Sequence, residues 1–185
     1  MGHMAHKHEE VRGIPNTIRP SLVRAAEDGE RRWFFGGGEH IWKATADETD
    51  GAFLLFEDRL DHGKVTPLHL HPDSDETMIV LEGEILMHLD GRDHVVGPGG
   101  LASAPRGAPH AFMVSGLDGA RLLCLHTPGC CQAFYWDASE PIHANDSGHD
   151  DRRVDMSRVQ ASAVKNGGIE ILGPPPFTTT DPGVP

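Results

Sequence analysis

The sequence predicts an all-β protein in which short antiparallel strands pack as a sandwich or a barrel. Between residues 31 and 137, short apolar runs alternate with Gly, Pro and Asp turns, and no long stretch has the helical period of about 3.6 residues. Regular short strands separated by turn signals are typical of these architectures. The length of 185 residues and the hydrophobic share of 38% suit a single core, so we expect one folded domain.

The expected strands occupy residues 32–35, 40–44, 52–60, 65–71, 76–81, 84–89, 94–96, 100–104, 110–114, 120–126 and 132–136. Short helices are expected at residues 21–29 and 156–165, the second ended by a Gly pair, with a further strand at 169–172. We therefore divide the chain into an N-terminal arm (1–30), the β domain (31–137) and a C-terminal extension that packs on it (138–185). The opening residues Met1 to Met4 are typical of a vector remnant, and His6 and His8 lie in the arm, outside the site.

Charge and composition exclude several classes of partner. A formal net charge of -12 without a run of Lys or Arg argues against nucleic acid and against an anionic membrane surface. The longest apolar run, residues 78–81, is too short to span a bilayer, and no signal-peptide pattern opens the chain. Three cysteines do not make a disulfide framework, so we expect the protein to lie in the reducing cytoplasm. The points above also lead us to expect a soluble protein whose partner is a small organic substrate.

The most informative stretch carries two histidines and a glutamate between glycines. His69 and His71 are one residue apart, so in a strand both imidazoles leave the same face. Pro72 cannot continue a central ladder, and the Asp-Ser-Asp run after it is turn chemistry. The chain therefore reverses and returns Glu76 to the two histidines, although Asp73 and Asp75 are alternative carboxylates at the same turn.

A second stretch supplies a third imidazole. Gly107 and Pro109 shape a tight turn, and His110 begins an apolar strand directly after it. Three neutral imidazoles and one carboxylate suit a borderline divalent ion, namely Mn, Fe, Co, Ni, Cu or Zn. The alternative is that these are ordinary polar residues of strands and turns. The pair Cys130 and Cys131 has no second Cys pair nearby and is not expected to bind a metal.

Both stretches resemble the sequence motifs of the cupin superfamily. The first pattern, Gly, five residues, His-any-His, three or four residues, Glu, six residues, Gly, is matched from Gly63 to Gly83. The second is matched at Gly99, Pro105, Gly107 and His110, with Val114 in place of its final Asn. The resemblance implies a double-stranded β-helix, the jelly-roll barrel, over residues 31–137, and its spacing selects Glu76 over the neighbouring aspartates. It also implies that the metal is held by His69, His71, Glu76 and His110.

The period of two along a strand also predicts the surroundings of the ion. Met78 and Val80 share parity with Glu76, while Phe112 and Val114 share parity with His110, so we expect an apolar pocket wall made of these four side chains. The alternative is that each of these four side chains is simply part of the hydrophobic core. His126 has the same parity as Leu122 and Cys124 in an apolar strand. It either lines the pocket or is a core histidine whose hydrogen bonds are satisfied. Such a pocket favours a planar or hydrophobic organic substrate.

Within the cupins, four segments look similar to small quercetin 2,3-dioxygenase-like proteins: HLHPDSDETMIVLEGE, PRGAPHAF, LHTPG and GIEILGPP. That resemblance implies a dioxygenase that cleaves a flavonol-like or other enolisable substrate with dioxygen. Glu76 would then be a ligand and also the general base. The alternatives are a metal-dependent isomerase or β-dicarbonyl-cleaving cupin, which needs no dioxygen, and a non-enzymatic small-molecule binding cupin. The resemblance also implies a homodimer.

Overall fold

The computed structural model describes residues 19–34, 37–143 and 155–177. The strands are β1 (Glu30–Trp33), β2 (Gly38–Ala44), β3 (Leu54–Leu60), β4 (Leu68–Leu70), β5 (Asp75–Gly83), β6 (Ile85–Leu89), β7 (Arg92–Val96), β8 (Leu101–Ala104), β9 (His110–Val114), β10 (Ala120–Thr127), β11 (Glu140–Pro141) and β12 (Glu170–Gly173). The helices are α1 (Gln132–Ala138) and α2 (Met156–Asn166). The predictions for the vector remnant, His6 and His8 concern residues outside the described ranges.

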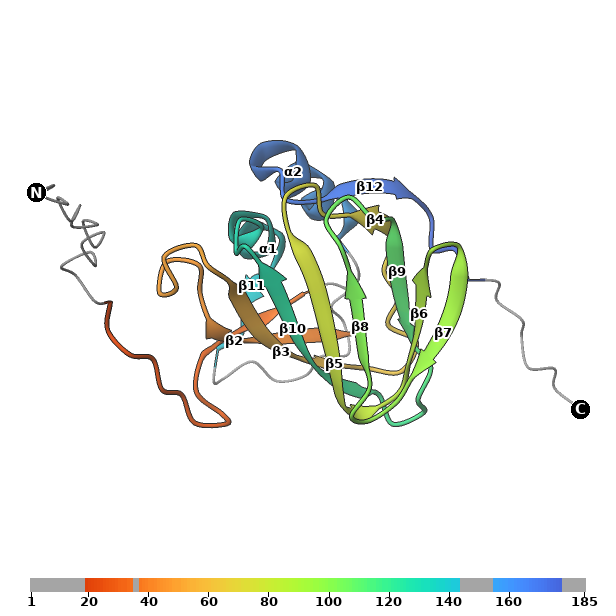
Figure 1. The fold of residues 1–185 in the computed structure, drawn as a ribbon, viewed down its shortest axis with the longest axis horizontal. Helices are drawn as coiled ribbons and strands as arrows, with labels where there is room; N and C mark the ends of the chain where they lie inside the picture. The colour runs from red at the N-terminus through yellow and green to blue at the C-terminus, as the bar shows by residue number, and fades with distance from the viewer. Residues whose placement is uncertain (1–18, 35–36, 144–154, 178–185) are drawn as a thin grey trace, which may run out of the picture.

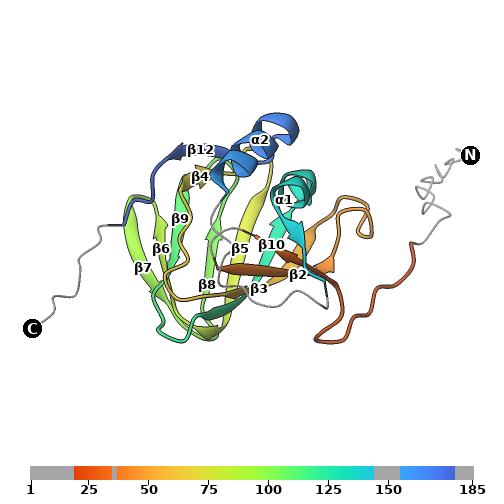
Figure 2. The ribbon, with the colours of Figure 1, turned by 180° about the vertical axis from the view of Figure 1, so that it is seen from behind.

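These strands form two antiparallel sheets, as Figures 1 and 2 show from opposite sides. One sheet has the order β11-β1-β2-β3-β10-β5-β8 and the other the order β12-β4-β9-β6-β7. The connections are non-local, since β10 lies between β3 and β5, and β9 lies between β4 and β6. The predicted all-β double-sheet fold is confirmed.

Alternating side chains of the two sheets form the core. In β5 the buried positions are Glu76, Met78 and Val80, and in β10 the positions Leu122 and Cys124 face the same interior. Across the gap, the second sheet contributes Ile85, Met87, Phe112 and Val114, all buried. Full burial of one such apolar side chain contributes about 1.5–3 kcal/mol, which is why the strands keep this register.

Gly83, the last position of the first motif, has a structural reason to be Gly. Its φ is 74°, and a Cβ there would lie 2.1 Å from the backbone oxygen of Gly119. A side chain would therefore clash with the adjacent loop as well as strain the backbone. This motif position shapes the end of β5, far along the strand from Glu76, and does not contribute to the site.

Three predicted elements differ from the structure. The strand predicted at 132–136 is helix α1, because the segment packs on α2: Ser162 Oγ donates to the Phe134 carbonyl at 2.8 Å, and the Lys165 side chain pairs with the Asp137 carboxylate at 2.6 Å. The helix predicted at 21–29 is absent, since this segment buries no apolar face and Val23 is 92% exposed. Strand β4 is shorter than the predicted 65–71 because Pro67 has no N–H for the ladder.

The C-terminal extension completes the second sheet. The predicted helix and strand at 156–165 and 169–172 are confirmed as α2 and β12. Strand β12 pairs with β4, and Ile171 lies opposite His69. Helix α2 begins at the N-cap Asp155, whose side chain accepts from Arg158 N. The extension therefore reaches the strand that carries the first motif.

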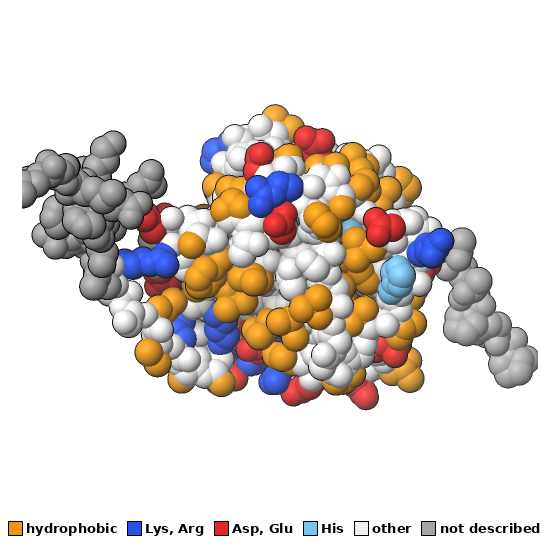
Figure 3. Space-filling view, viewed as in Figure 1, with side chains coloured by type: hydrophobic (Ala, Val, Ile, Leu, Met, Phe, Trp, Pro, Cys, Tyr) orange, Lys and Arg blue, Asp and Glu red, His pale blue; other side chains and the backbone are white. Residues whose placement is uncertain are grey.

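On the face seen in Figure 3, Lys and Arg side chains lie among Asp and Glu, with hydrophobic groups between them. Several large apolar side chains of the described residues are exposed, among them Val95 at 65% and Leu101 at 58% on neighbouring strands of the chain. Over the described ranges, no helix is both long enough and apolar enough to cross a membrane.

Candidate metal centre and its cavity

Three strand ends bring the predicted ligands together. His69 lies in β4, directly opposite His110 at the start of β9, and Glu76 lies at the start of β5 in the other sheet. His71 follows β4, and its carbonyl accepts from Gly107 N at 2.8 Å, which joins the loops of the two motifs. One ligand atom from each of the four residues lies within 4.8 Å of the others, and all four are buried.

Backbone carbonyls orient the three imidazoles. Nδ1 of His69 lies 2.8 Å from the Pro67 carbonyl, and Nδ1 of His110 lies 2.8 Å from the Ala108 carbonyl, each two residues earlier in the chain. Nδ1 of His71 lies 2.6 Å from the carbonyl of Gly168, just before β12. A carbonyl can only accept, so each Nδ1 carries a proton, and Nε2 is the ring nitrogen that faces the cluster and offers a lone pair when the ring is neutral.

Glu76 divides its two oxygens between two groups. Oε2 lies 2.6 Å from His110 Nε2 and 3.5 Å from His71 Nε2. Oε1 accepts from the Cys124 thiol at 3.2 Å and lies 3.7 Å from His126 Nε2. One oxygen therefore faces the predicted ligands, and the other is fixed by strand β10.

Burial and charge set the protonation of this cluster. Burial raises the pKa of Glu76, but the hydrogen bond from His110, with the imidazole of His71 at 3.5 Å, outweighs it and places the pKa well below the usual range. Burial lowers the pKa of His110, but the hydrogen bond and charge of Glu76 leave it raised. Burial, with the charge of neighbouring imidazoles, lowers the pKa of His69 to about 3. The carboxylate is therefore ionised at neutral pH and His69 is neutral, as metal ligands must be.

The residues present fit a divalent metal. Nε2 of His71 is buried and has no hydrogen-bond partner, although it faces the carboxylate. With Nδ1 protonated, His110 Nε2 donates to Glu76 only when the ring carries a second proton, and a metal ion that replaced this proton would bind the lone pairs of His110 and His71 together with the carboxylate. Imidazole and carboxylate together suit Mn, Fe, Co, Ni, Cu or Zn, and the donor set does not choose among them.

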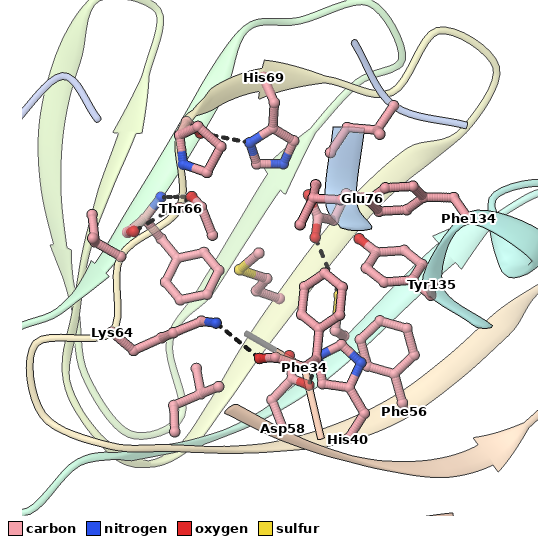
Figure 4. Close-up of a pocket in the computed structure, with 18 of the residues that line it drawn as sticks. Phe34, His40, Phe56, Asp58, Lys64, Thr66, His69, Glu76, Phe134 and Tyr135 are labelled. Atoms are coloured by element: carbon pink, nitrogen blue, oxygen red, sulfur yellow. Dashed lines mark hydrogen bonds and ion pairs between the residues drawn. The ribbon is translucent and has the colours of Figure 1, made fainter. Parts of the chain in front are cut away.

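A cavity of about 80 Å³ opens beside this cluster and runs between the sheets. Figure 4 shows His69 at one end and Lys64, Asp58 and His40 at the other, with aromatic side chains along the wall. Met78 and Phe112 are part of its lining, as is Tyr135 of helix α1. The extension closes it with Met156, Val159 and Ile169. The lining is mostly apolar, with polar groups at the two ends.

Not every predicted pocket residue lines this cavity. Val80 and Val114 are buried, at 0% and 1% exposed, but lie in the core beyond its lining. His126 is also fully buried and contacts Glu76 and Cys124 instead of the cavity, with burial lowering its pKa to about 3. Its Nδ1 has no hydrogen-bond partner. His126 therefore supports the carboxylate from behind.

The neighbouring acids and the other histidines lie away from the cluster. Asp75 binds Arg106 through its side chain at 3.0 Å, and Asp73 is exposed in the turn. His88 pairs with Asp93 at 2.6 Å on the second sheet. Neither aspartate is part of the four-residue cluster.

Sequence reasoning did not identify the opposite end of the cavity. His40 of β2 and Asp58 of β3 are cross-strand partners, and His40 Nε2 lies 3.1 Å from Asp58 Oδ1. Lys64 is only 6% exposed, and its Nζ donates to the Phe34 carbonyl at 2.9 Å. Asp58 and Lys64 lie in the sequence among other charged residues, such as Glu57 and Asp61, so no local signal marks them as a site, and nothing local shows that His40 joins them.

Comparison with known proteins shows that part of the chain matches a protein family. Residues 56–126 match the protein family described as a cupin domain. Quercetin 2,3-dioxygenase of Bacillus subtilis (strain 168) is 32% identical over 99 residues, a match that covers 54% of this chain and 29% of that protein. The chain thus spans less than a third of the length of this curated relative.

Solved structures share the fold. A predicted oxalate decarboxylase from Thermotoga maritima aligns with a TM-score of 0.52 and 22% identity, covering 58% of this chain and 99% of the other. An RmlC-like cupin from Shewanella frigidimarina aligns with a TM-score of 0.51 and 19% identity, covering 59% of this chain and 92% of the other. At such identities the likeness concerns the fold alone.

Proposed function

The chain is a member of the cupin superfamily, and we propose that it is a metal-dependent dioxygenase acting on a small enolisable organic substrate. The observation that carries the proposal is a single cavity that joins a buried cluster of three imidazoles and a carboxylate to an apolar wall. The similarity of half of the chain to a quercetin 2,3-dioxygenase supports the type of reaction.

The proposed ligands are His69, His71, Glu76 and His110. A transition-metal ion bound there would polarise an oxygen of the substrate, and a redox-active ion would also let dioxygen react. The protein contributes orientation, because three backbone carbonyls fix the imidazoles before any ion arrives. Such outer hydrogen bonds typically change metal affinity or activity by roughly 10–100-fold when they are removed.

Glu76 is the proposed base as well as a ligand. Its carboxylate is ionised, lies at the edge of the cavity and keeps Oε2 on the side of the histidines. The thiol of Cys124 holds Oε1, so the proton of an enolisable substrate would be taken by Oε2. General-base catalysis of this kind contributes about 10²–10⁴-fold to a rate.

The cavity favours a small substrate. Its volume of about 80 Å³ is well below the roughly 300–1,000 Å³ of pockets that bury drug-sized ligands. Met78 and Phe112 border the cluster and exclude water from the place where the substrate would lie. A short β-dicarbonyl therefore fits this arrangement better than a three-ring flavonol.

An oxygen-uptake screen tests the proposal. The chain would be loaded separately with Mn, Fe, Co, Ni, Cu and Zn, and supplied with β-diketones and flavonols. We expect metal-dependent oxygen consumption with a short β-diketone, lost in Glu76→Gln and kept in Asp75→Asn, whose side chain binds Arg106 instead of the cluster. Turnover that persists without oxygen would favour the isomerase or β-dicarbonyl-cleaving alternative, and binding without turnover would favour a binding protein.

The setting proposed for this activity is a homodimer in a reducing cytoplasm. Among the described residues the three cysteines are free, and Cys124 and Cys131 are buried. The exposed Val95 and Leu101 offer apolar surface for a second copy. Light scattering after gel filtration tests the dimer, and a monomer over the whole concentration range would contradict it.

A further inference from the structure

The cavity has a second polar end, away from the four-residue cluster. Its members are Lys64, Asp58 and His40, which are 6%, 4% and 3% exposed. All three line the same cavity as His69 and Glu76. Figure 4 shows Lys64 reaching in from one side, with Asp58 and His40 across from it. Phe34, Phe56 and Leu60 are apolar members of the same lining.

The polar atoms at this end lack partners. Asp58 Oδ1 lies 3.1 Å from His40 Nε2 but is not in hydrogen-bonding geometry, and His40 Nδ1 has no partner either. The ring of His40 is stacked on Phe56 at a centroid distance of 4.4 Å, so it does not turn freely toward another group. Lys64 has three N–H donors, and among the described residues it hydrogen-bonds only to the Phe34 carbonyl. Buried polar groups are normally satisfied, so this end is built for a polar occupant.

The charge at this end favours an anion. Burial lowers the pKa of Lys64 to about 8, which leaves most of the ammonium charged at neutral pH. Burial raises the pKa of Asp58 well above its usual range, which favours its neutral form. Burial also lowers the pKa of His40 well below its usual range. A metal ion is not favoured here, because within the described ranges no third ligand-type side chain joins His40 and Asp58 in a cluster.

We propose that Lys64, together with His40 and Asp58, binds a carboxylate group of the substrate while the substrate's enolisable carbonyl lies at the His69 and Glu76 end. The substrate class is thus a short keto acid, with one end recognised by the ammonium and the other by the metal centre. The inference rests on the proposed function for the role of the metal end, but the carboxylate site stands on Lys64 and its neighbours. Lys64 is then a specificity-determining residue.

The test compares two probes of equal size, acetoacetate and acetylacetone, which differ in a carboxylate oxygen replacing a methyl group. Binding of each to the metal-loaded chain would be measured by calorimetry in wild type and in Lys64→Met. We expect Lys64→Met to weaken acetoacetate binding at least tenfold and to change acetylacetone binding less than threefold. Lys43→Met is the matched control, because Lys43 pairs with Glu57 at 3.8 Å outside the cavity.

An unchanged affinity of Lys64→Met for acetoacetate, or an equal loss for both probes, would overturn the inference. Lys64→Met removes the donor to the Phe34 carbonyl, so Lys64→Gln, which keeps a donor there, repeats the test if Lys64→Met does not fold. The readout is binding, so it separates the two proposals. Lys64-dependent binding without oxygen uptake would contradict only the dioxygenase, and oxygen uptake with Lys64-independent binding would contradict only the carboxylate site.

Discussion

The two ends of the cavity are equally buried, but they are held in different ways. At the metal end, His69 and His110 each bond to a carbonyl two residues back in their own chain segment. At the other end, His40 and Asp58 meet across two strands and leave polar atoms unpartnered. The imidazoles of the first end are oriented by hydrogen bonds to backbone carbonyls, whereas the polar groups of the second end keep unpartnered atoms. We therefore expect substitutions at the cluster to reduce metal binding and substitutions at the Lys64 end to change ligand binding.

The largest expected effect is loss of the metal. His71→Ala removes an unpartnered Nε2 from the cluster and also the bond from Nδ1 to the Gly168 carbonyl. We expect near-complete loss of bound metal and of activity, and loss of the increase in melting temperature that metal gives to wild type, because an ion that binds only the folded chain stabilises it. Elemental analysis and thermal melts measure both.

His88→Ala is the control for that prediction, since His88 pairs with Asp93 away from the cluster. Full metal occupancy in His71→Ala, or equal loss in both variants, would show that this cluster is not the binding site.

A smaller effect is expected from Glu76→Gln. The amide keeps the shape and one oxygen donor but cannot accept the substrate's proton, so the rate should fall by roughly a hundredfold while some metal binding persists. Oxygen uptake at measured, equal metal occupancy is the test. A wild-type rate would make Glu76 a ligand only.

This carboxylate also predicts the acid limb of the pH profile. Burial raises the pKa of Glu76, but the hydrogen bond from His110 and the nearby His71 hold it well below its usual range, and a bound cation would favour the ionised form in the same way. A lowered pKa keeps the carboxylate ionised as pH falls, so wild-type activity at constant metal occupancy should persist below the usual glutamate pKa of about 4.3 and fall only under it. A fall in rate already near neutral pH, without metal loss, would contradict this.

A substitution in the apolar wall between the two ends should change the substrate preference. Phe112 lines the cavity and is 6% exposed, and Phe112→Leu would shorten the apolar wall without adding a polar group. We expect a several-fold shift in kcat/KM toward bulkier β-diketones, of the size that about 1–3 kcal/mol per methylene-scale change allows. Metal content should be unchanged, and Val114→Ala, which alters the core beyond the lining, should not shift the preference.

The smallest effect concerns stability at the Lys64 end. In the folded chain burial lowers the pKa of Lys64 from 10.5 to about 8, with Asp58 and Asp61 opposing the shift. Between these pH values the unfolded state binds more protons, so the free energy of unfolding contributed by Lys64 rises with pH. Urea titrations should show wild type gaining stability relative to Lys64→Met from pH 8 to pH 10, and a constant difference would mean that Lys64 is not buried.

The metal end was predictable because its two motifs are short patterns and the family resemblance links them, although the pairing of β4 with β9 that joins His69 to His110 is itself long-range. The His-any-His spacing, the turn after His71 and the turn before His110 each act within a few residues, and the structure brings those side chains together. The contact of His126 with Glu76 depends instead on the pairing of β10 with β5, and that of His40 with Asp58 on the pairing of β2 with β3. Register between distant strands is not encoded in a short pattern, so the second end was missed.

The segment that follows the last long strand, residues 132–136, also could not be predicted from its local sequence. The aromatic run at residues 132–136 has the composition of a strand, yet it forms α1 because Ser162 and Lys165 of α2 bond to it. That change of structure matters for the site, since α1 places Tyr135 in the lining of the cavity. Local propensity was overridden by a helix that lies later in the chain.

The most direct test of the account is anomalous X-ray scattering from a crystal of the metal-loaded chain, recorded at the absorption edge of the bound metal. The account predicts one peak within about 2.0–2.2 Å of Nε2 of the three cluster histidines and of one carboxylate oxygen of Glu76, the distances usual for such ligands. A peak centred on Cys131 and His126, or no peak between His71 and Glu76 in a crystal of full metal content, would contradict it.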